Sequence, residues 1–307
     1  RRSERIKQGT AKPARYAAAT VKLREGGHNA EEKNARINEA KKAEIKQVFE
    51  ELKALQPVEK GEIPEGIKPL GCHLFTVEKF DASGQHEKYK SRLVSHGNEQ
   101  DQSLYPDRSS PTVSVHAILT CLALAACNTG YTLGKIDVKG AFIQTEMSGT
   151  PVYIKCTRQL RDLIVDLYPE YEKYIGRDGV LYCKLLKALY GCVQASKLWY
   201  QKVCKFLESL GYERGEVDPC VFRRVVGEKV YLLTLYVDDI LLIAESSEIE
   251  RVGKAFETEY RWITMAVGNS HSYVGMVLTV ERECVVLDMR YYLINLLQPY
   301  DNLQVKT

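Results

Sequence analysis

Apolar residues recur with helical spacing in four parts of the chain. The first face ends before Pro57, the second follows the potential N-cap Ser114 and ends near Gly130, and the third ends at Gly211. A fourth helix is predicted after Ser246 and Ser247, whose hydroxyls can cap it. The positions that define these faces are Ile37, Ile45, Val48, Phe49, Leu52 and Leu55; Val115, Ile118, Leu119, Leu122 and Ala126; Ala195, Leu198, Trp199, Phe206 and Leu210; and Ile249, Val252, Phe256 and Tyr260.

Other segments are rich in β-branched and aromatic residues and are bounded by turn residues, which predicts strands. A first hairpin is expected from GCHLFTVEKF and KYKSRLVSH, joined by DASG, and a second from KVYLLTLYV and DDILLIAE. Further strands are predicted in TLGKIDVKGAF, PVYIKC, PCVFRRV, SYVGMVLTVE and CVVLD, a strand or loop in VLYCKLLKALYG, and a last helix over 289–297. The central order of strand, helix, hairpin and helix predicts an α+β fold, a split β-α-β sheet with helices on one face.

Length and composition set broad limits. A chain of 307 residues with 45% apolar and 27% charged residues can form one or two globular domains. It contains no run near the roughly 20 apolar residues of a membrane span, and its first residues lack the apolar core of a secretory signal. The first methionine is Met147, which suggests a piece of a longer product. Nine scattered cysteines without CxxC spacing favour reduced thiols over disulfides or zinc.

Charge changes this picture only near the start of the chain. The net charge is +3, but residues 1–60 hold 15 Lys and Arg against nine Glu. Such a segment can attract phosphates, or it can be a solvated lead-in without a packed structure.

The most informative feature is the acidic pair Asp238 and Asp239, which lies between two apolar runs in YLLTLYVDDILLIAE. Adjacent carboxylates repel each other and are costly between buried strands, and hairpin turns more often use Asn-Gly or Asp-Gly. One interpretation is a solvated turn. The other is a bound divalent cation that neutralises the pair.

A third carboxylate, Asp137, ends the strand-like run TLGKID. Alone it could be a hydrogen-bonded structural residue. Together with the acidic pair it could form a site for phosphoryl transfer, which uses oxygen ligands to hold two Mg²⁺ ions about 3.5–4 Å apart.

The order of these segments resembles the copia-type retrotransposon reverse transcriptases over about residues 35–300. The resemblance is carried by KYKSRLVSHG, LGKIDVKGAFIQ, VYIKC, CKLLKALYGCVQASKLWYQKV, DPCVF, LYVDDILLIA and YVGMVLTVE. It implies a right-hand polymerase with fingers, a ferredoxin-like (RRM-like) palm and the start of a thumb. The implied divisions are a basic linker (1–30), fingers (31–115), palm (116–156), a fingers excursion (157–190), palm (191–280) and thumb start (281–307).

The resemblance also implies roles for single residues. Asp137 and Asp238 would bind both Mg²⁺ ions, with Mn²⁺ as a substitute, and Asp239 would support the primer end more weakly. Phe142 would exclude a 2′-hydroxyl, and Gln194 would reach the sugar and phosphate of the incoming nucleotide. One of Lys90 and Arg92 would contact the triphosphate. Residues 273–277 match a segment that grips the primer.

For several of these residues a plainer interpretation stays open. Phe142 could be core, Gln194 a capping or surface residue, and the cations of KYKSRLV alternating charges on an exposed strand. The sequence also departs from the family pattern, with Gly140 in place of Asn, Ser196 in place of Pro, and His96-Gly97 in place of Lys-Gly. The Gly140 and Ser196 exchanges could loosen the nucleotide pocket.

The leading functional hypothesis is a retrotransposon RNA-directed DNA polymerase. Its partners would be an RNA or DNA template with primer, dNTPs, and other parts of a Pol polyprotein such as integrase and RNase H, which this sequence does not contain. We expect no membrane partner and no secretion, but a place in cytoplasmic virus-like particles or the nucleus. The alternative is a weakened or inactive nucleic-acid-binding remnant. A metal-dependent nuclease or phosphatase would not account for Phe142 and Gln194.

Overall fold

The computed structural model describes residues 30–80, 86–105, 107–108 and 110–297. The predicted basic linker over residues 1–30 therefore lies outside the described residues except for Ala30. The same holds for the DASG loop and for residues 298–307 of the predicted thumb start.

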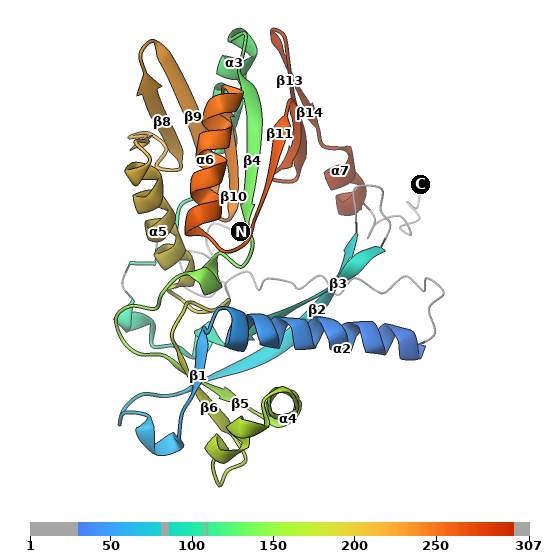
Figure 1. Ribbon diagram of the computed structural model, residues 1–307, viewed down its shortest axis with the longest axis vertical. Helices are drawn as coiled ribbons and strands as arrows, with labels where there is room; N and C mark the ends of the chain where they lie inside the picture. The colour runs from blue at the N-terminus through green and yellow to red at the C-terminus, as the bar shows by residue number, and fades with distance from the viewer. Residues whose placement is uncertain (1–29, 81–85, 106, 109, 298–307) are drawn as a thin grey trace, which may run out of the picture.

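The described helices and strands form a mixed α+β chain, which confirms the predicted class (Figure 1). The α-helices are α2 (Ala30–Lys46), α3 (Val115–Cys127), α4 (Arg158–Leu167), α5 (Ala195–Ser209), α6 (Ser246–Glu259) and α7 (Arg290–Leu297). The strands are β1 (Leu55–Pro57), β2 (Leu70–Phe80), β3 (His86–Ser95), β4 (Thr132–Val138), β5 (Tyr153–Cys156), β6 (Leu181–Leu185), β7 (Glu213–Arg214), β8 (Val221–Val226), β9 (Lys229–Tyr236), β10 (Asp239–Ala244), β11 (Ile263–Gly268), β12 (Ser270–Tyr273), β13 (Met276–Glu281) and β14 (Cys284–Asp288).

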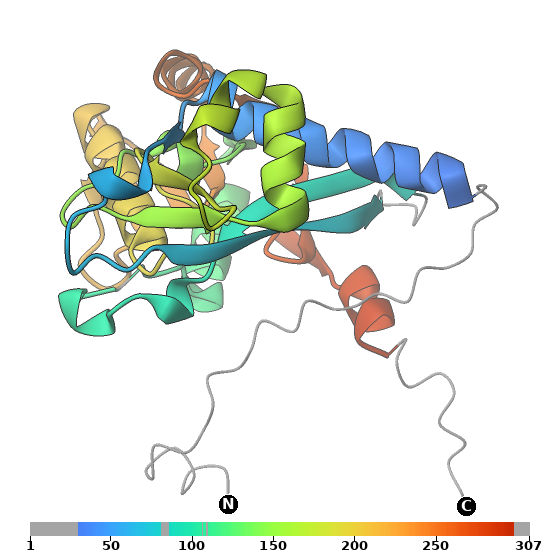
Figure 2. The same ribbon diagram turned by 90° about the horizontal axis from the view of Figure 1, so that it is seen from below.

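A six-stranded sheet in the order β11-β4-β10-β9-β8-β7 forms the centre of the larger unit. Helix α6 lies on one face of this sheet and α3 on the other, as the two perpendicular views show (Figures 1 and 2). The prediction of helices on one face only was therefore wrong. The reason lies in β10, whose residues Ile240 to Ala244 are all buried, so that both faces of the strand need a cover.

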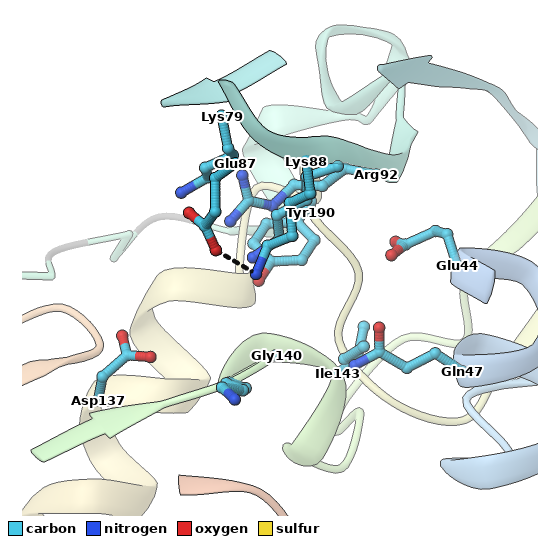
Figure 3. Close-up of a pocket in the computed structure, with 12 residues that line it drawn as sticks. Glu44, Gln47, Lys79, Glu87, Lys88, Arg92, Asp137, Gly140, Ile143 and Tyr190 are labelled. Atoms are coloured by element: carbon cyan, nitrogen blue, oxygen red, sulfur yellow. Dashed lines mark ion pairs between the residues drawn. The ribbon is translucent and has the colours of Figure 1, made fainter. Parts of the chain in front are cut away.

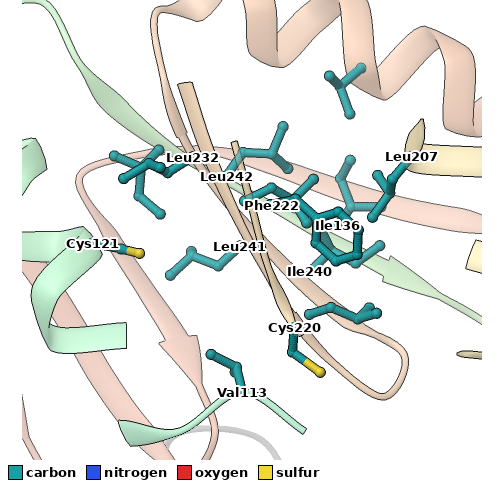
Figure 4. Close-up of a cluster of buried hydrophobic side chains, with 14 of the residues drawn as sticks. Val113, Cys121, Ile136, Leu207, Cys220, Phe222, Leu232, Ile240, Leu241 and Leu242 are labelled. Atoms are coloured by element: carbon teal, nitrogen blue, oxygen red, sulfur yellow. The ribbon is translucent and has the colours of Figure 1, made fainter. Parts of the chain in front are cut away.

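The side chains of β10 show this two-sided packing directly (Figure 4). Leu241 points toward Cys121 of α3 and toward Val113, whereas Ile240 lies on the opposite side of the strand with Leu207 of α5. A core of this kind is stabilised by apolar burial, which contributes roughly 25 cal/mol per Å².

A second sheet, in the order β1-β6-β5-β2-β3, forms a smaller unit with its own apolar core. Its hairpin β2–β3 is the one predicted from GCHLFTVEKF and KYKSRLVSH. Helix α2 lies along this hairpin (Figure 2). Strand β5 pairs with β2 and β6 in this sheet.

The two units meet at the segment that follows β4. Phe142 packs against both apolar cores. Next to it, the buried Gln144 donates from Nε2 to the Lys139 carbonyl over 2.8 Å and accepts from the Arg261 backbone N–H over 2.9 Å. These contacts fix the chain between Asp137 and the smaller unit.

Three local predictions differ from the structure: the place of Leu55, the cap of the fourth helix, and the strand over SYVGMVLTVE, which is divided between β12 and β13 by a turn at Val274 and Gly275. Leu55 lies in β1 rather than on the first helix, because a π-helical turn over Gln47–Glu51 ends that helix early and the chain then pairs with β6. Helix α6 begins after Glu245 without a side-chain cap, so the predicted capping by Ser246 and Ser247 was wrong. Strand β11 was not predicted at all. Within the described residues, no helix is both long and apolar enough to cross a membrane.

Candidate active site

The backbone of the large sheet brings the three predicted aspartates together. In the antiparallel pair of β4 and β10, Asp137 lies directly opposite Asp239. Residues opposite each other on adjacent strands point to the same face, with Cβ atoms about 4.5–5.5 Å apart. Asp238 is the preceding residue, in the turn of the β9–β10 hairpin.

The turn that carries Asp238 is held in a strained conformation. Val237 has φ +57, which is unfavourable for a β-branched residue and costs about 1–3 kcal/mol. Two contacts hold it there: Trp199 of α5 donates its indole N–H to the Val237 carbonyl over 2.6 Å, and the Val138 N–H donates to the Asp238 carbonyl over 3.3 Å. The core of the protein thus determines where the acidic pair lies.

Burial makes the acidic pair electrostatically unfavourable. It raises the pKa of Asp238, and the carboxylates of Asp137 and Asp239 raise it further. Burial also raises the pKa of Asp239, although Lys135, with Nζ 3.2 Å from Oδ1, opposes this rise. A site of this kind gains most from a bound cation.

The three carboxylates are close together, but their side chains are not arranged in a metal-coordinating geometry. Among the described residues, no three His, Cys, Asp or Glu side chains are arranged to hold a metal ion. The fit to a hard divalent cation therefore rests on the chemistry of the donors, three carboxylates at one strand edge, and on their desolvation.

A cavity of about 380 Å³ lies between β3 and the segment after β4. Its lining includes Lys90 and Arg92 of β3, Asp137 of β4 and Gly140 of the turn that follows β4. Figure 3 shows Arg92 across the cavity from Asp137 and Gly140. The other lining residues are Glu44, Gln47, Lys79, Glu87, Lys88, Lys139, Ile143 and Tyr190. Both predicted cations are half-buried, and contact of either with a triphosphate stays a prediction.

The cations in this cavity repel one another. Burial lowers the pKa of Lys90, and the neighbouring Arg92 and Lys79 lower it further, while Asp137 and Glu44 oppose the change. A polyanion such as a triphosphate would relieve this repulsion.

Glu44 is a site residue that the sequence did not reveal. It lies in α2, is only 7% exposed, and accepts the Leu93 N–H over 2.9 Å. Strand β3 is at the edge of its sheet, so without Glu44 this buried N–H would have no strand partner. Glu44 therefore holds the strand that carries Lys90 and Arg92.

We expect Glu44→Gln to cost less than about 1 kcal/mol of unfolding free energy and Glu44→Leu about 1–3 kcal/mol. Burial raises the pKa of Glu44, so the fold already disfavours its charge, and Gln keeps an acceptor for Leu93. Leu fills the space but leaves that N–H unpaired. Urea unfolding of both variants tests this, and equal stability of the Leu variant and the unchanged protein would contradict it.

Neither Gln194 nor Phe142 is among the residues that line the cavity. Gln194 is 5% exposed and is therefore not a surface residue; it occupies the N-cap position of α5, but its side chain makes no cap hydrogen bond. Its amide accepts from Gln100 over 3.0 Å and donates to the Tyr105 hydroxyl over 3.4 Å. Contact of Gln194 with a nucleotide stays a prediction. Phe142 approaches the cavity through Tyr190, at 5.1 Å between ring centroids.

The departures at Gly140 and Ser196 have simple structural explanations. Gly140 has φ +65, a left-handed conformation that Asn adopts more readily than other residues with a side chain. Ser196 lies in the first turn of α5, where the backbone N–H has no helical partner, so a proline there would lose no helix hydrogen bond. Neither exchange requires a looser pocket.

We therefore expect Gly140→Asn to change the unfolding free energy by less than about 1 kcal/mol, and Gly140→Val to cost about 2 kcal/mol more than Asn. An added Cβ would lie 3.0 Å from Ile143 Cγ1 and 3.3 Å from Gln47 Nε2, both on side chains that can adjust. Chemical denaturation of the two variants distinguishes the cost of the left-handed backbone conformation from the cost of steric contact with the added Cβ. Equal losses would show that the left-handed backbone is not what matters.

Paired carboxylates beside a cation-lined cavity define a candidate nucleotidyltransferase site. The reverse transcriptase (RNA-dependent DNA polymerase) family model matches residues 58–306, so the chain belongs to this family. It is 30% identical over 248 residues to the retrovirus-related Pol polyprotein from transposon TNT 1-94 of Nicotiana tabacum, covering 78% of this chain. It is also 30% identical over 182 residues, 58% of this chain, to the Pol polyprotein from transposon RE1 of Arabidopsis thaliana.

These relatives confirm the resemblance to copia-type retrotransposon reverse transcriptases. The chain spans only 17% and 11% of their respective lengths. Among solved structures, telomerase from Candida albicans aligns with 81% of this chain and 49% of its own at 10% identity. The TM-score of 0.45 is too low to support a conclusion.

Proposed function

We propose that this chain is the polymerase part of a retrotransposon Pol polyprotein and adds dNTPs to a primer 3′-hydroxyl on an RNA or DNA template. The observation that carries this proposal is the strand register that puts Asp137 opposite Asp239, with Asp238 beside them and a cation-lined cavity in front. This combination suits a reaction in which a polyanionic substrate meets a metal-dependent catalyst.

Asp137 and Asp238 would hold two Mg²⁺ ions, or Mn²⁺ in their place. The ions would supply charge neutralisation at the attacking and leaving oxygens. Asp239 would contribute less, because Lys135 already pairs with it at 3.2 Å. The rest of the catalytic effect would come from positioning, with Trp199 and the β4–β10 register keeping the carboxylates in place.

The triphosphate would bind at Lys90 and Arg92 of β3, which line the same cavity as Asp137. The base and sugar would lie toward Phe142, whose ring would exclude a 2′-hydroxyl. Gln194 would reach the sugar and phosphate of the incoming nucleotide from a position fixed by its hydrogen bonds to Gln100 and Tyr105.

The fold supports an assignment to the parts of a right-hand polymerase. The five-stranded sheet and α2 would be the fingers, the six-stranded sheet with α3, α5 and α6 the palm, and α7 the start of the thumb. The turn between β12 and β13, within residues 273–277, would grip the primer. Lys135 donates to the Ser272 carbonyl over 2.7 Å, which joins this hairpin to Asp239. Integrase and RNase H would be partners within the polyprotein, in cytoplasmic particles or the nucleus.

Primer extension tests this proposal. The purified chain is incubated with an RNA template, a DNA primer, dNTPs and Mg²⁺ or Mn²⁺, beside a chelator control, and template–primer binding is measured in parallel. Metal-dependent extension is the expected result. Tight binding without extension in either metal would overturn the enzymatic proposal and favour a nucleic-acid-binding remnant.

A further inference from the structure

Tyr190 occupies a central place in the cavity that no sequence motif assigned to it. It lines the cavity together with the cations of β3 and lies across from Asp137 and Gly140 (Figure 3). It is half-buried, so one part of the ring packs inside the protein while another part reaches the cavity.

The ring of Tyr190 contacts two residues with different proposed tasks. The Phe142 ring lies 5.1 Å away between centroids at an interplanar angle of 53°. The Arg92 guanidinium carbon lies 4.9 Å from the Tyr190 centroid, within the range of a cation–π interaction. Tyr190 therefore links the residue proposed to contact the sugar with one proposed to contact the triphosphate.

The backbone of Tyr190 is fixed to the strand that carries Arg92. Its carbonyl accepts the Ser95 N–H over 2.8 Å, and Val94 and Tyr190 form a parallel bridge. The next residue, Gly191, packs so closely that an added Cβ would lie 2.1 Å from the Ser95 carbonyl oxygen. The ring consequently has a fixed origin from which to support both neighbours.

The phenol of Tyr190 is suited to stay neutral in this cavity. Burial raises the pKa of Tyr190, the Arg92 cation opposes this, and the charge of Asp238 adds to the rise. A neutral ring offers Arg92 a π face without competing with a triphosphate for its charge.

We propose that Tyr190 is a specificity-determining positioning residue of the nucleotide site: its ring holds Phe142 against the deoxyribose and Arg92 toward the triphosphate. This inference rests on the proposed function, since it takes a deoxynucleoside triphosphate as the ligand. It predicts that the aromatic ring, rather than the hydroxyl, carries the effect.

The test compares Tyr190→Leu and Tyr190→Phe with the unchanged protein. Tyr131→Leu is the matched control, because Tyr131 is a half-buried tyrosine that precedes β4 at the end opposite Asp137. Binding of dGTP and GTP is titrated on a complex with template and a dideoxy-terminated primer, which needs no turnover. In a separate assay, extension of an ordinary primer with the same nucleotides gives KM and kcat. A thermal melt checks folding, and Tyr190→Met replaces the Leu variant if that variant does not melt cooperatively.

We expect the Leu or Met variant to lose about tenfold in preference for dGTP over GTP and to raise the KM for dGTP about tenfold, with a much smaller change in kcat. Tyr190→Phe restores most of the preference, and Tyr131→Leu keeps it. An unchanged preference in a folded Leu or Met variant would overturn the role of Tyr190. Absence of extension by the unchanged protein would instead overturn the proposed function, while the binding ratios would still decide the inference.

Discussion

Replacing Asp238 by Asn should lower the rate of primer extension by about 10³-fold or more, while the protein stays folded. Asn keeps the shape of the side chain in the β9–β10 turn but removes the charge that would hold a cation. A single-nucleotide incorporation assay measures the loss. The matched control is Asp166→Asn, the same chemical change at an exposed position of α4.

The same variant should be more stable than the unchanged protein when no metal is present. The folded pKa of Asp238 is raised, so the ionised carboxylate disfavours the folded state above that pKa, and protonation relieves the cost as pH falls. At pH 7 we expect Asp238→Asn to melt about 2–4 °C higher, the shift that about 1 kcal/mol gives in a large domain. Extension within threefold of the unchanged protein, or a lower melting temperature, would refute the assigned role.

Gly97→Ala should destabilise the fold by about 3 kcal/mol or more. A Cβ at Gly97 would lie 1.9 Å from the Gly191 carbonyl oxygen, a backbone atom that cannot rotate away. To relieve this clash, the end of β3 would have to move away from the loop that contains Tyr190. This movement would break the hydrogen bond of 2.8 Å from the Ser95 N–H to the Tyr190 carbonyl.

Gly61→Ala is the control for that substitution, because nothing lies within 4 Å of its added Cβ. It should change the unfolding free energy by no more than about 0.5 kcal/mol. Urea denaturation compares the two variants. If Gly97→Ala unfolds at the same urea concentration as Gly61→Ala, the close backbone contact described here is not present in solution.

The sequence predicted those parts of the fold that depend on local pattern. The helices at Ser114 and at Ala195, the hairpin from GCHLFTVEKF and the acidic hairpin all follow from periodicity and turn residues, and the structure confirms them. The strand position of Leu55 and the existence of strand β11 could not be predicted from local pattern, because tertiary pairing determines both. Leu55 pairs with β6, and β11 pairs with β4.

The candidate site was predictable only where a motif marks it. The three aspartates, Lys90 and Arg92 belong to recognisable segments, and the structure brings Asp137, Lys90 and Arg92 to one cavity. Glu44 and Tyr190 were missed because their roles arise from contacts over long sequence separations: Glu44 with Leu93, and Tyr190 with Phe142 and Arg92. The one signal for Glu44 in the local sequence was a charged residue on the apolar face of the predicted first helix.

Counting bound Mn²⁺ by electron paramagnetic resonance most directly tests the three-aspartate site. The complex contains template, dideoxy-terminated primer and dNTP, and a variant with Asn at all three aspartate positions is the comparison. We predict about two Mn²⁺ ions per unchanged chain, and in the variant no more Mn²⁺ than the free triphosphate carries. Equal Mn²⁺ binding by the two proteins would contradict the assignment of Asp137, Asp238 and Asp239 as the metal-binding carboxylates.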